Sequence, residues 1–149
     1  MKMKTVVVTT DLSDFSKKAF PFARDLAQKY GARVVVCYVE EHRVPPLVIE
    51  YPGIGFDDMM QHQRERAIDL LERLVEEQLG RELESEIRVI DGMAHVGIIQ
   101  LAQELQADLI VMTTHGRGFF SHAILGSTTE RVVRRAPCPV LVVREEHEE

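Results

Sequence analysis

Short runs of β-branched apolar residues alternate along this chain with longer stretches in which apolar residues recur at helical spacing. Strong runs occupy residues 5–9, 33–39, 109–112 and 140–143, and a weaker, alternating run at 86–90 suits an edge strand with one solvated face. This alternation is typical of βα units whose parallel strands are buried on both faces. The pattern therefore predicts an α/β fold with five parallel strands.

Four helical stretches connect these runs. The first begins at a Ser13 or Asp14 cap and ends at Gly31, and because Pro21 removes one backbone hydrogen bond we expect a kink or a late start there. The others cover about 58–79, the region 98–105, and 127–135. The 149 residues predict one domain over 1–149, with a long loop rich in proline and glycine at 41–57 and an acidic tail at 144–149.

Composition excludes several classes of protein. The formal net charge of -6 argues against a general affinity for nucleic acid, which depends on clustered Lys and Arg. Cys37 and Cys138 lie outside any CxxC motif, so we expect reduced thiols and no zinc site. The N-terminal apolar run breaks at Thr9, too early for a signal peptide, and no span approaches the ~20 apolar residues of a membrane helix. We therefore expect a cytoplasmic protein without nucleic acid or membrane partners.

Polar segments follow three of the predicted strands. Thr9, Thr10 and Asp11 end the first strand, Val39, Glu40 and Glu41 end the second, and residues 113–118 follow the fourth. Ligands of open parallel sheets bind beyond the carboxyl ends of the strands, where neighbouring connections leave in opposite directions. These segments therefore mark the candidate binding site.

The last helix begins beside a glycine, at Gly126-Ser127-Thr128-Thr129-Glu130. Free N–H groups and the helix dipole make such a start an anion site. Four arginines stand against one glutamate between residues 113 and 135, which favours this interpretation in a chain of net negative charge. The same residues also match a capping box, in which Ser127 accepts a helical N–H and Glu130 reaches back. The spacing alone leaves both interpretations open.

Several of these segments carry a resemblance to a known family. Thr114-His115-Gly116-Arg117-Gly118, then 124–127, then 131–143 resemble the C-terminal signature of the universal stress protein family, and 8–13, 36–39, 91–94 and 107–112 resemble its other strands. The similarity covers the chain except 41–57. It implies an open parallel sheet of order 3-2-1-4-5 with helices on both faces, a Rossmann-like fold of the adenine nucleotide alpha hydrolase-like type. In that order Cys37 and Cys138 lie about 14 Å apart, beyond the ~7 Å that a disulfide tolerates.

The nucleotide-binding branch of this family carries Gly-x2-Gly-x9-Gly-Ser/Thr after the fourth strand. The pattern falls here on Thr113, Gly116, Gly126 and Ser127, with Thr113 in place of the first glycine. The resemblance implies phosphate binding by Gly116, Gly126, Ser127, Thr128 and Thr129, adenine contacts from Asp11, Val39 and Met112, and ribose contacts from Thr9 and Thr113, with Thr10, His115 and Arg117 completing the site. Asp11 as a helix cap, Met112 as a core residue and His115 as a backbone-orienting residue remain alternatives.

Taken together, the residues and the resemblance predict an ATP-binding regulatory module. ATP, or ADP or AMP, would lie at the carboxyl ends of the first and fourth strands, with Mg²⁺ held through the phosphates, no catalytic residue and little or no hydrolysis. The alternative, suggested by Thr113, is a dimeric interaction protein of the same fold that binds no nucleotide. A phosphoacceptor switch at Asp11 and Asp91 is disfavoured, because Leu12 and Arg144 stand where such switches need a second acid and a lysine.

The final apolar run also predicts assembly. Residues 140–143 would form an exposed apolar sheet edge in a monomer, which proteins usually cover. Pairing with a second copy across a two-fold axis is the simplest cover. We therefore expect a homodimer through this strand, together with an unidentified protein partner.

Overall fold

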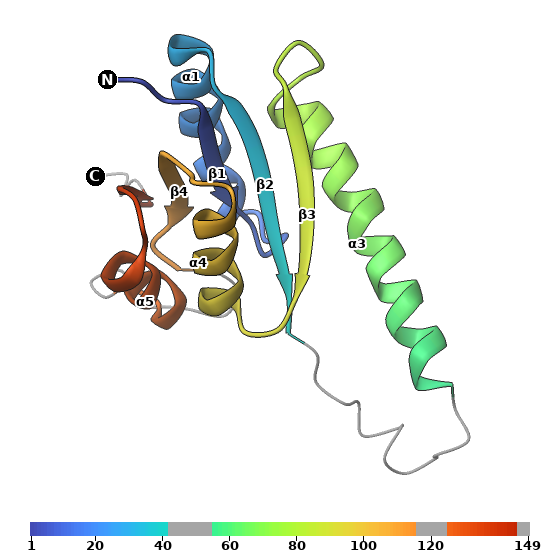
Figure 1. The fold of residues 1–149 in the computed structure, drawn as a ribbon. Coiled ribbons are helices and arrows are strands. Elements are labelled where there is room, and N and C mark those ends of the chain that lie inside the picture. The colour runs from blue at the N-terminus through green and yellow to red at the C-terminus, as the bar shows by residue number, and fades with distance from the viewer. Residues whose placement is uncertain (42–54, 116–124, 146–149) are drawn as a thin grey trace.

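The computed structural model describes residues 1–41, 55–115 and 125–145 and shows a five-stranded parallel sheet of order β3-β2-β1-β4-β5 (Figure 1). Every neighbouring pair of strands runs parallel. The expected fold class and strand order are therefore confirmed. The strands are β1 (Thr5–Thr9), β2 (Arg33–Glu40), β3 (Ser85–Asp91), β4 (Leu109–Thr113) and β5 (Val140–Val143).

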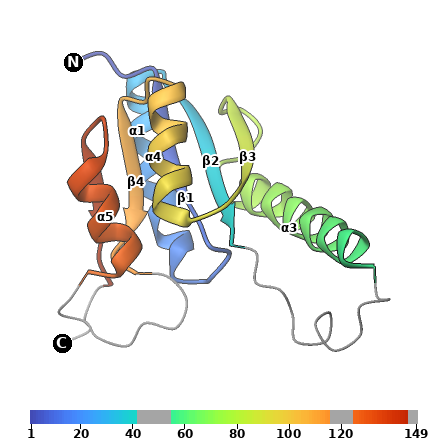
Figure 2. The same ribbon diagram turned by 60° about the horizontal axis from the view of Figure 1, so that its bottom comes forward.

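Helices cover both faces of this sheet (Figure 2). One face carries α1 (Phe20–Tyr30) and α3 (Phe56–Gln78), and the other carries α4 (Ala94–Glu104) and α5 (Ser127–Arg135). Successive side chains of β1 alternate between the two layers, with Val6 and Val8 in one core cluster and Val7 in the other. All three are fully buried, which explains why this strand is an uninterrupted apolar run.

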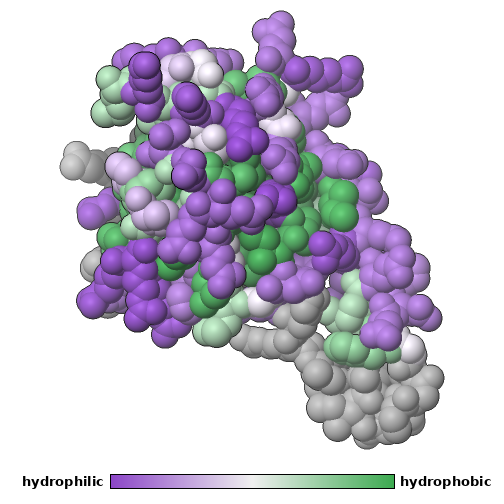
Figure 3. All heavy atoms as spheres, in the orientation of Figure 1, coloured by the Kyte–Doolittle hydropathy of each residue, from purple (hydrophilic) through white to green (hydrophobic). Residues whose placement is uncertain are grey.

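Hydrophilic side chains dominate the surface in the orientation of Figure 1, with hydrophobic areas between them (Figure 3). The bulk of the apolar volume lies inside, where Phe20, Leu71 and Ile110 are among the largest fully buried side chains. None of the helices in the described ranges combines the length and apolar composition needed to cross a bilayer.

The first helix begins late, as expected from its proline. A short 3-10 turn, η1 (Ser16–Ala19), precedes α1, and Pro21 lies in the first turn of α1, where its missing N–H breaks no helical hydrogen bond. The predicted cap at Ser13 or Asp14 is wrong, because Phe15 is the N-cap of η1 and Ala19 that of α1. The Ser13 hydroxyl does accept a hydrogen bond from the Ser16 N–H, at 3.2 Å, just before this turn. Gly31 ends α1 in the left-handed conformation, at φ 66°.

The second helix differs from its predicted bounds at its start. α3 begins at Phe56, so the end of the predicted loop at 41–57 is helical, while residues 42–54 lie outside the described part. Its first turns extend beyond the sheet (Figure 1), and the buried residues Ala67, Leu71 and Leu74 all lie in its later part. Of the acidic tail, only Arg144 and Glu145 are described. Both cysteines are free thiols, as predicted.

Candidate functional site

The candidate site lies at the carboxyl ends of β1, β2 and β4. The chain leaves β1 toward α1 on one face of the sheet, and it leaves β4 toward α5 on the other. This divergence opens a crevice between the two connections, which is where open α/β sheets bind ligands.

An inner pocket of about 120 Å³ opens between these strand ends and the helices α4 and α5. Cys37, Val39, Ile98 and Met112 give it apolar walls, and threonines from three segments line its polar side. Such a mixture of apolar walls and a few polar groups is typical of small-molecule sites. The complete lining is Thr9, Thr10, Asp11, Ser16, Cys37, Val39, Ala94, Ile98, Met112, Thr113, His115, Thr128 and Thr129.

An outer hollow of about 380 Å³ continues from the inner pocket toward the start of α5. Residues common to both are Asp11, Val39, Ala94, His115, Thr128 and Thr129. Gly126 and Ser127 join them in the outer hollow, so the first turn of α5 forms part of its wall. The first N–H groups of an α-helix have no partner within the helix, and they attract anions.

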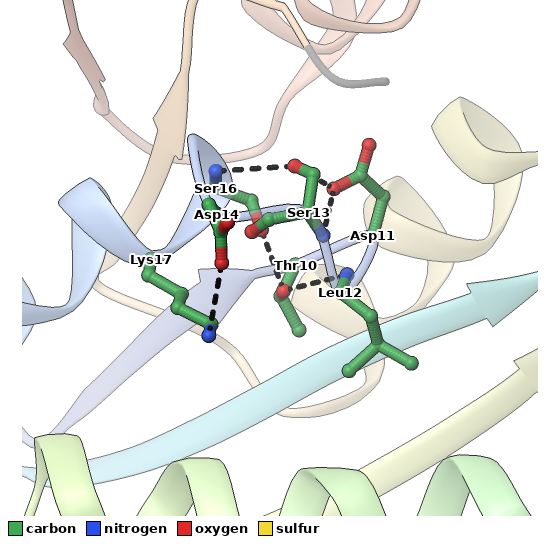
Figure 4. Close-up of polar contacts among 7 residues, drawn as sticks. All are labelled: Thr10, Asp11, Leu12, Ser13, Asp14, Ser16 and Lys17. Carbon is green, nitrogen blue, oxygen red and sulfur yellow. Dashed lines mark hydrogen bonds and ion pairs between the residues drawn. The ribbon is translucent and has the colours of Figure 1, made fainter.

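The loop after β1 is held by its own polar side chains (Figure 4). Asp11 Oδ1 accepts hydrogen bonds from the N–H of Ser13, at 2.9 Å, and from its hydroxyl. Thr10 Oγ1 accepts the Leu12 N–H at 3.0 Å and lies 2.8 Å from the Ser16 hydroxyl oxygen. Leu12 adopts a φ of 67°, a conformation that costs a non-glycine residue energy and that these hydrogen bonds stabilise. Asp11 therefore fixes a turn and caps neither η1 nor α1.

A second set of hydrogen bonds joins the end of β4 to the start of α5. The Thr113 hydroxyl donates to the His115 carbonyl, and the buried Thr129 hydroxyl donates to the Thr113 carbonyl, both at 2.9 Å. The Gly126 N–H donates to the Thr114 carbonyl at 2.8 Å. A Cβ at Gly126 would lie 3.3 Å from His115 Cα and from the Thr114 carbonyl oxygen, so a larger residue would require the backbone at these two positions to shift by a few tenths of an ångström.

The start of α5 is not a capping box. Gly126 is the N-cap residue and no side chain caps the helix, while the Glu130 carboxylate forms an ion pair with Arg134 at 2.9 Å. Glu130 therefore faces the next turn of its own helix and does not reach back to the N-cap. Of the two alternatives for this segment, the capping interpretation is wrong.

The electrostatic character of the site is mixed. Asp11 and Glu41 bring carboxylates to the outer hollow, where Glu41 Oε1 also accepts the Ala94 N–H at the start of α4, at 2.9 Å. In the inner pocket, burial raises the pKa of the Cys37 thiol to about 12, and the nearby Arg88 charge offsets only part of this effect. Cys37 is therefore a neutral, apolar part of the wall at physiological pH.

Most of the predicted site residues come together in these two spaces. Thr9, Thr10, Asp11, Val39, Met112, Thr113, His115, Thr128 and Thr129 line the inner pocket, and Gly126 and Ser127 line the outer hollow. Met112 is also buried, so it is a core residue and a wall residue at once. The predicted Gly116 and Arg117 lie outside the described residues.

Four lining residues of the inner pocket were missed from the sequence, Ser16, Cys37, Ala94 and Ile98, and so was Tyr38 of the outer hollow. Cys37 could have been found, because it lies two positions before Val39 and shares its face of β2. Ala94 and Ile98 belong to α4, whose approach to the strand ends is set by tertiary packing.

The two acids of the disfavoured phosphoacceptor switch are not brought together. Asp91 forms an ion pair with Arg64 of α3 at 3.3 Å and lines neither the inner pocket nor the outer hollow. Across the described residues, no group of three or more His, Cys, Asp and Glu side chains is placed to hold a metal ion.

Comparison with known proteins agrees with this architecture. The sequence profile of the universal stress protein family matches residues 2–144. A universal stress protein of Thermus aquaticus is 36% identical over 143 residues, which cover 95% of this chain and 98% of that protein.

Two solved structures extend the comparison. Hypothetical protein MJ0577 of Methanocaldococcus jannaschii shares the fold with a TM-score of 0.83 at 23% identity, over 99% of this chain and 100% of that one. A universal stress protein in complex with cAMP superposes with a TM-score of 0.62 at 25% identity, over 98% of this chain and 100% of that one. The chain described here belongs to the universal stress protein family.

Proposed function

We propose that this chain is a regulatory module that binds ATP, with the adenosine part in the inner pocket and the phosphates in the outer hollow. The observation that carries the proposal is the continuity of the two spaces: an apolar pocket opens directly onto a helix start rich in hydroxyl and N–H donors. An adenine nucleotide has the matching division into a flat, weakly polar base and a chain of anionic groups. The family member solved with cAMP supports the same class of ligand.

The donors at the start of α5 suit phosphate oxygens. Among the described residues, no side chain or backbone group accepts from or donates to the Ser127 and Thr128 hydroxyls, whereas the Thr129 hydroxyl is used to hold β4. Hydrogen bonds from such hydroxyls and from helical N–H groups to charged oxygens are stronger than those between neutral groups. Ser127 and Thr128 are therefore the proposed phosphate-binding side chains.

The carboxylates at the same hollow fit a nucleotide only as its magnesium complex. Asp11 and Glu41 would repel a bare triphosphate, and Mg²⁺ prefers carboxylate, phosphate and water oxygens, which are the donors available here. When bound, the ion would neutralise phosphate charge. We propose slow or absent hydrolysis, because Asp11 Oδ1 already accepts two hydrogen bonds from Ser13 that hold it in its own turn.

The test is to identify the small molecules released when freshly purified protein is denatured, and to measure thermal unfolding with added Mg-ATP. The proposal predicts an adenine nucleotide in the released fraction and a stabilisation of about 2.7 kcal/mol when the nucleotide is present at 100 times its Kd. Without any released nucleotide and without any shift in millimolar Mg-ATP, the proposal is wrong. That result would favour the alternative of an interaction protein without nucleotide.

We further propose that two copies pair through β5. The two edges of the sheet differ: the outer strand β3 carries Glu86 and Arg88, with Arg88 paired to Glu86 at 3.2 Å and to Glu104 at 2.7 Å, whereas β5 is Val140–Val143. Charged side chains protect an edge strand from pairing, and apolar ones invite it. Light scattering at micromolar concentration should give a dimer mass for the wild type and a monomer mass for Val142→Lys. A monomeric wild type would contradict the pairing.

A further inference from the structure

Phe15 contacts the candidate site indirectly, through His115. The two rings stack with their centroids 4.3 Å apart and their planes 12° apart. His115 lines both the inner pocket and the outer hollow, whereas Phe15 lines neither. The stacked imidazole therefore offers Phe15 a direct route to a ligand in the site.

The backbone on each side of this stack is fixed. Phe15 immediately precedes η1 with helical φ and ψ angles, and Lys18 Nζ lies over its ring, 5.5 Å from the centroid. On the other side, the His115 carbonyl accepts the Thr113 hydroxyl, and His115 Cα lies close against Gly126. The imidazole itself has a second contact, because its Nδ1 lies 3.1 Å from the Thr114 hydroxyl oxygen. Rotation about the last side-chain bond of histidine is otherwise broad, so the stack and this hydrogen bond act together on the plane of the ring.

We propose that Phe15 is a positioning residue for nucleotide binding: together with the Thr114 hydroxyl, its ring sets the plane of the His115 imidazole at the wall that the inner pocket shares with the outer hollow. This inference rests on the proposed function, since it assigns His115 a contact with the bound nucleotide. A side chain already held in its bound orientation loses less conformational entropy when the ligand arrives. The flat ring of Phe15 thus increases affinity without touching the ligand.

The experiment measures the Kd of Mg-ATP by calorimetry for the wild type, Phe15→Leu, Phe15→Tyr, His115→Ala and the double variant of Phe15→Leu with His115→Ala. Leucine keeps the apolar volume but removes the flat ring, and tyrosine keeps the ring. From the usual strength of a ring stack, Phe15→Leu should weaken binding about three- to tenfold, while Phe15→Tyr stays within twofold of the wild type. In the His115→Ala background, Phe15→Leu should have no further effect. Thermal unfolding without nucleotide shows which variants are folded.

Several outcomes would overturn the inference. They are an unchanged Kd in Phe15→Leu, an equal loss in Phe15→Tyr, a full effect of Phe15→Leu when His115 is already alanine, and an unchanged Kd in His115→Ala. The Kd of His115→Ala still tests the inference if Phe15→Leu does not fold. Failure of the proposed function is distinguishable, because the wild type itself would then show no binding of Mg-ATP.

Discussion

Two spaces flank the end of β2, one on each face of the sheet, and they differ in chemistry. Cys37 and Val39 line the inner pocket, while Tyr38 and Glu40 line a hollow of about 270 Å³ beside α3, here called the α3 hollow. Its complete lining is Leu12, Tyr38, Glu40, Glu41, Gln63, Arg66, Ala67 and Leu70. Tyr38 and Glu41 lie at the boundary, since they line both the α3 hollow and the outer hollow. Alternation of side chains along one strand thus creates two different environments within four residues.

The inner pocket and the α3 hollow differ in the residues that lie opposite β2. Across the inner pocket stand Thr128 and Thr129 at the start of α5, with its unpaired N–H groups. Across the α3 hollow, Gln63 and Arg66 lie in the middle of α3, and Glu40 and Glu41 line the same space. A helix start can supply several N–H donors to one anion, whereas the middle of a helix supplies only side chains. We therefore predict that the nucleotide binds only on the α5 side of the sheet.

The largest expected effect concerns the dryness of the inner pocket. Only the thiolate of a cysteine reacts with alkylating agents, and a pKa of about 12 leaves Cys37 with about a thousandth of the thiolate of an ordinary cysteine at pH 8. In a Cys138→Ala variant, which reports Cys37 alone, iodoacetamide labelling followed by mass spectrometry should therefore be about a thousandfold slower than for the unfolded chain. Labelling at the unfolded rate would show that the pocket is open to water.

The same pKa shift predicts a loss of stability at high pH. The unfolded chain releases the Cys37 proton near pH 9, whereas the folded chain retains it to about pH 12, so unfolding becomes easier as pH rises between these values. The slope from this group is about 1.4 kcal/mol per pH unit. Urea unfolding at pH 8, 9 and 10 should therefore show a shallower decline for Cys37→Ala than for the wild type. Equal slopes would mean that the buried thiol is not responsible.

The next effect concerns the outer hollow. Gly126→Val places a branched side chain against His115 and Thr114, where even a single Cβ would lie at 3.3 Å, and it displaces the α5 N–H groups from a bound phosphate. Mg-ATP affinity should fall about 10- to 100-fold, the equivalent of one or two charge-assisted hydrogen bonds. Calorimetry measures the Kd, and circular dichroism of the free variant checks its fold. A folded variant with wild-type affinity would refute phosphate binding at this glycine.

Substitutions of two neighbouring threonines should affect nucleotide binding and stability separately. Thr128→Val should weaken Mg-ATP binding about three- to tenfold and leave stability unchanged, because its hydroxyl is proposed to bind only phosphate. Thr129→Val removes the donor to the buried Thr113 carbonyl and should lower the free energy of unfolding by about 1–3 kcal/mol in urea titrations. If Thr128→Val instead destabilised the free protein by as much, its assignment to the ligand would be wrong.

The smallest expected effect belongs to the α3 hollow. Arg66→Gln removes a cation from this hollow, where it would be a natural contact for a phosphate if the nucleotide bound on that face. We expect the Kd of Mg-ATP to change by less than twofold, which makes this variant the matched control for Gly126→Val. A tenfold loss of Mg-ATP affinity in Arg66→Gln would indicate that the nucleotide binds in the α3 hollow and would contradict binding on the α5 side.

Hydrophobic periodicity and the positions of proline and glycine predicted most of the fold. The bounds of β1, β5 and α5 agree with the runs at 5–9, 140–143 and 127–135, because uninterrupted apolar runs and a proline-bounded helix leave few alternatives. The start of α3 was missed by two residues: Phe56 and Asp57 follow Gly55 in a segment that local composition marks as loop. Strand order came from the resemblance, since periodicity does not specify which strands are neighbours.

The site was less predictable than the fold. Strand ends mark where ligands bind, so Asp11, Val39 and Thr113 could be named from the sequence. The residues at Ser127 and Glu130 match a capping box locally. In the structure Gly126 is the N-cap and donates its N–H to the Thr114 carbonyl after β4, and Glu130 forms an ion pair with Arg134. The stack of Phe15 on His115 joins residues 100 positions apart, and no local pattern indicates such a contact.

The most direct measurement is a calorimetric titration of Mg-ATP into the wild type, Gly126→Val and Arg66→Gln under the same conditions. Binding on the α5 side predicts one nucleotide per chain for the wild type, the same affinity for Arg66→Gln, and a loss of about 10- to 100-fold for Gly126→Val. No binding heat from the wild type at millimolar Mg-ATP, or equal affinities for the wild type and Gly126→Val, would contradict nucleotide binding at this site.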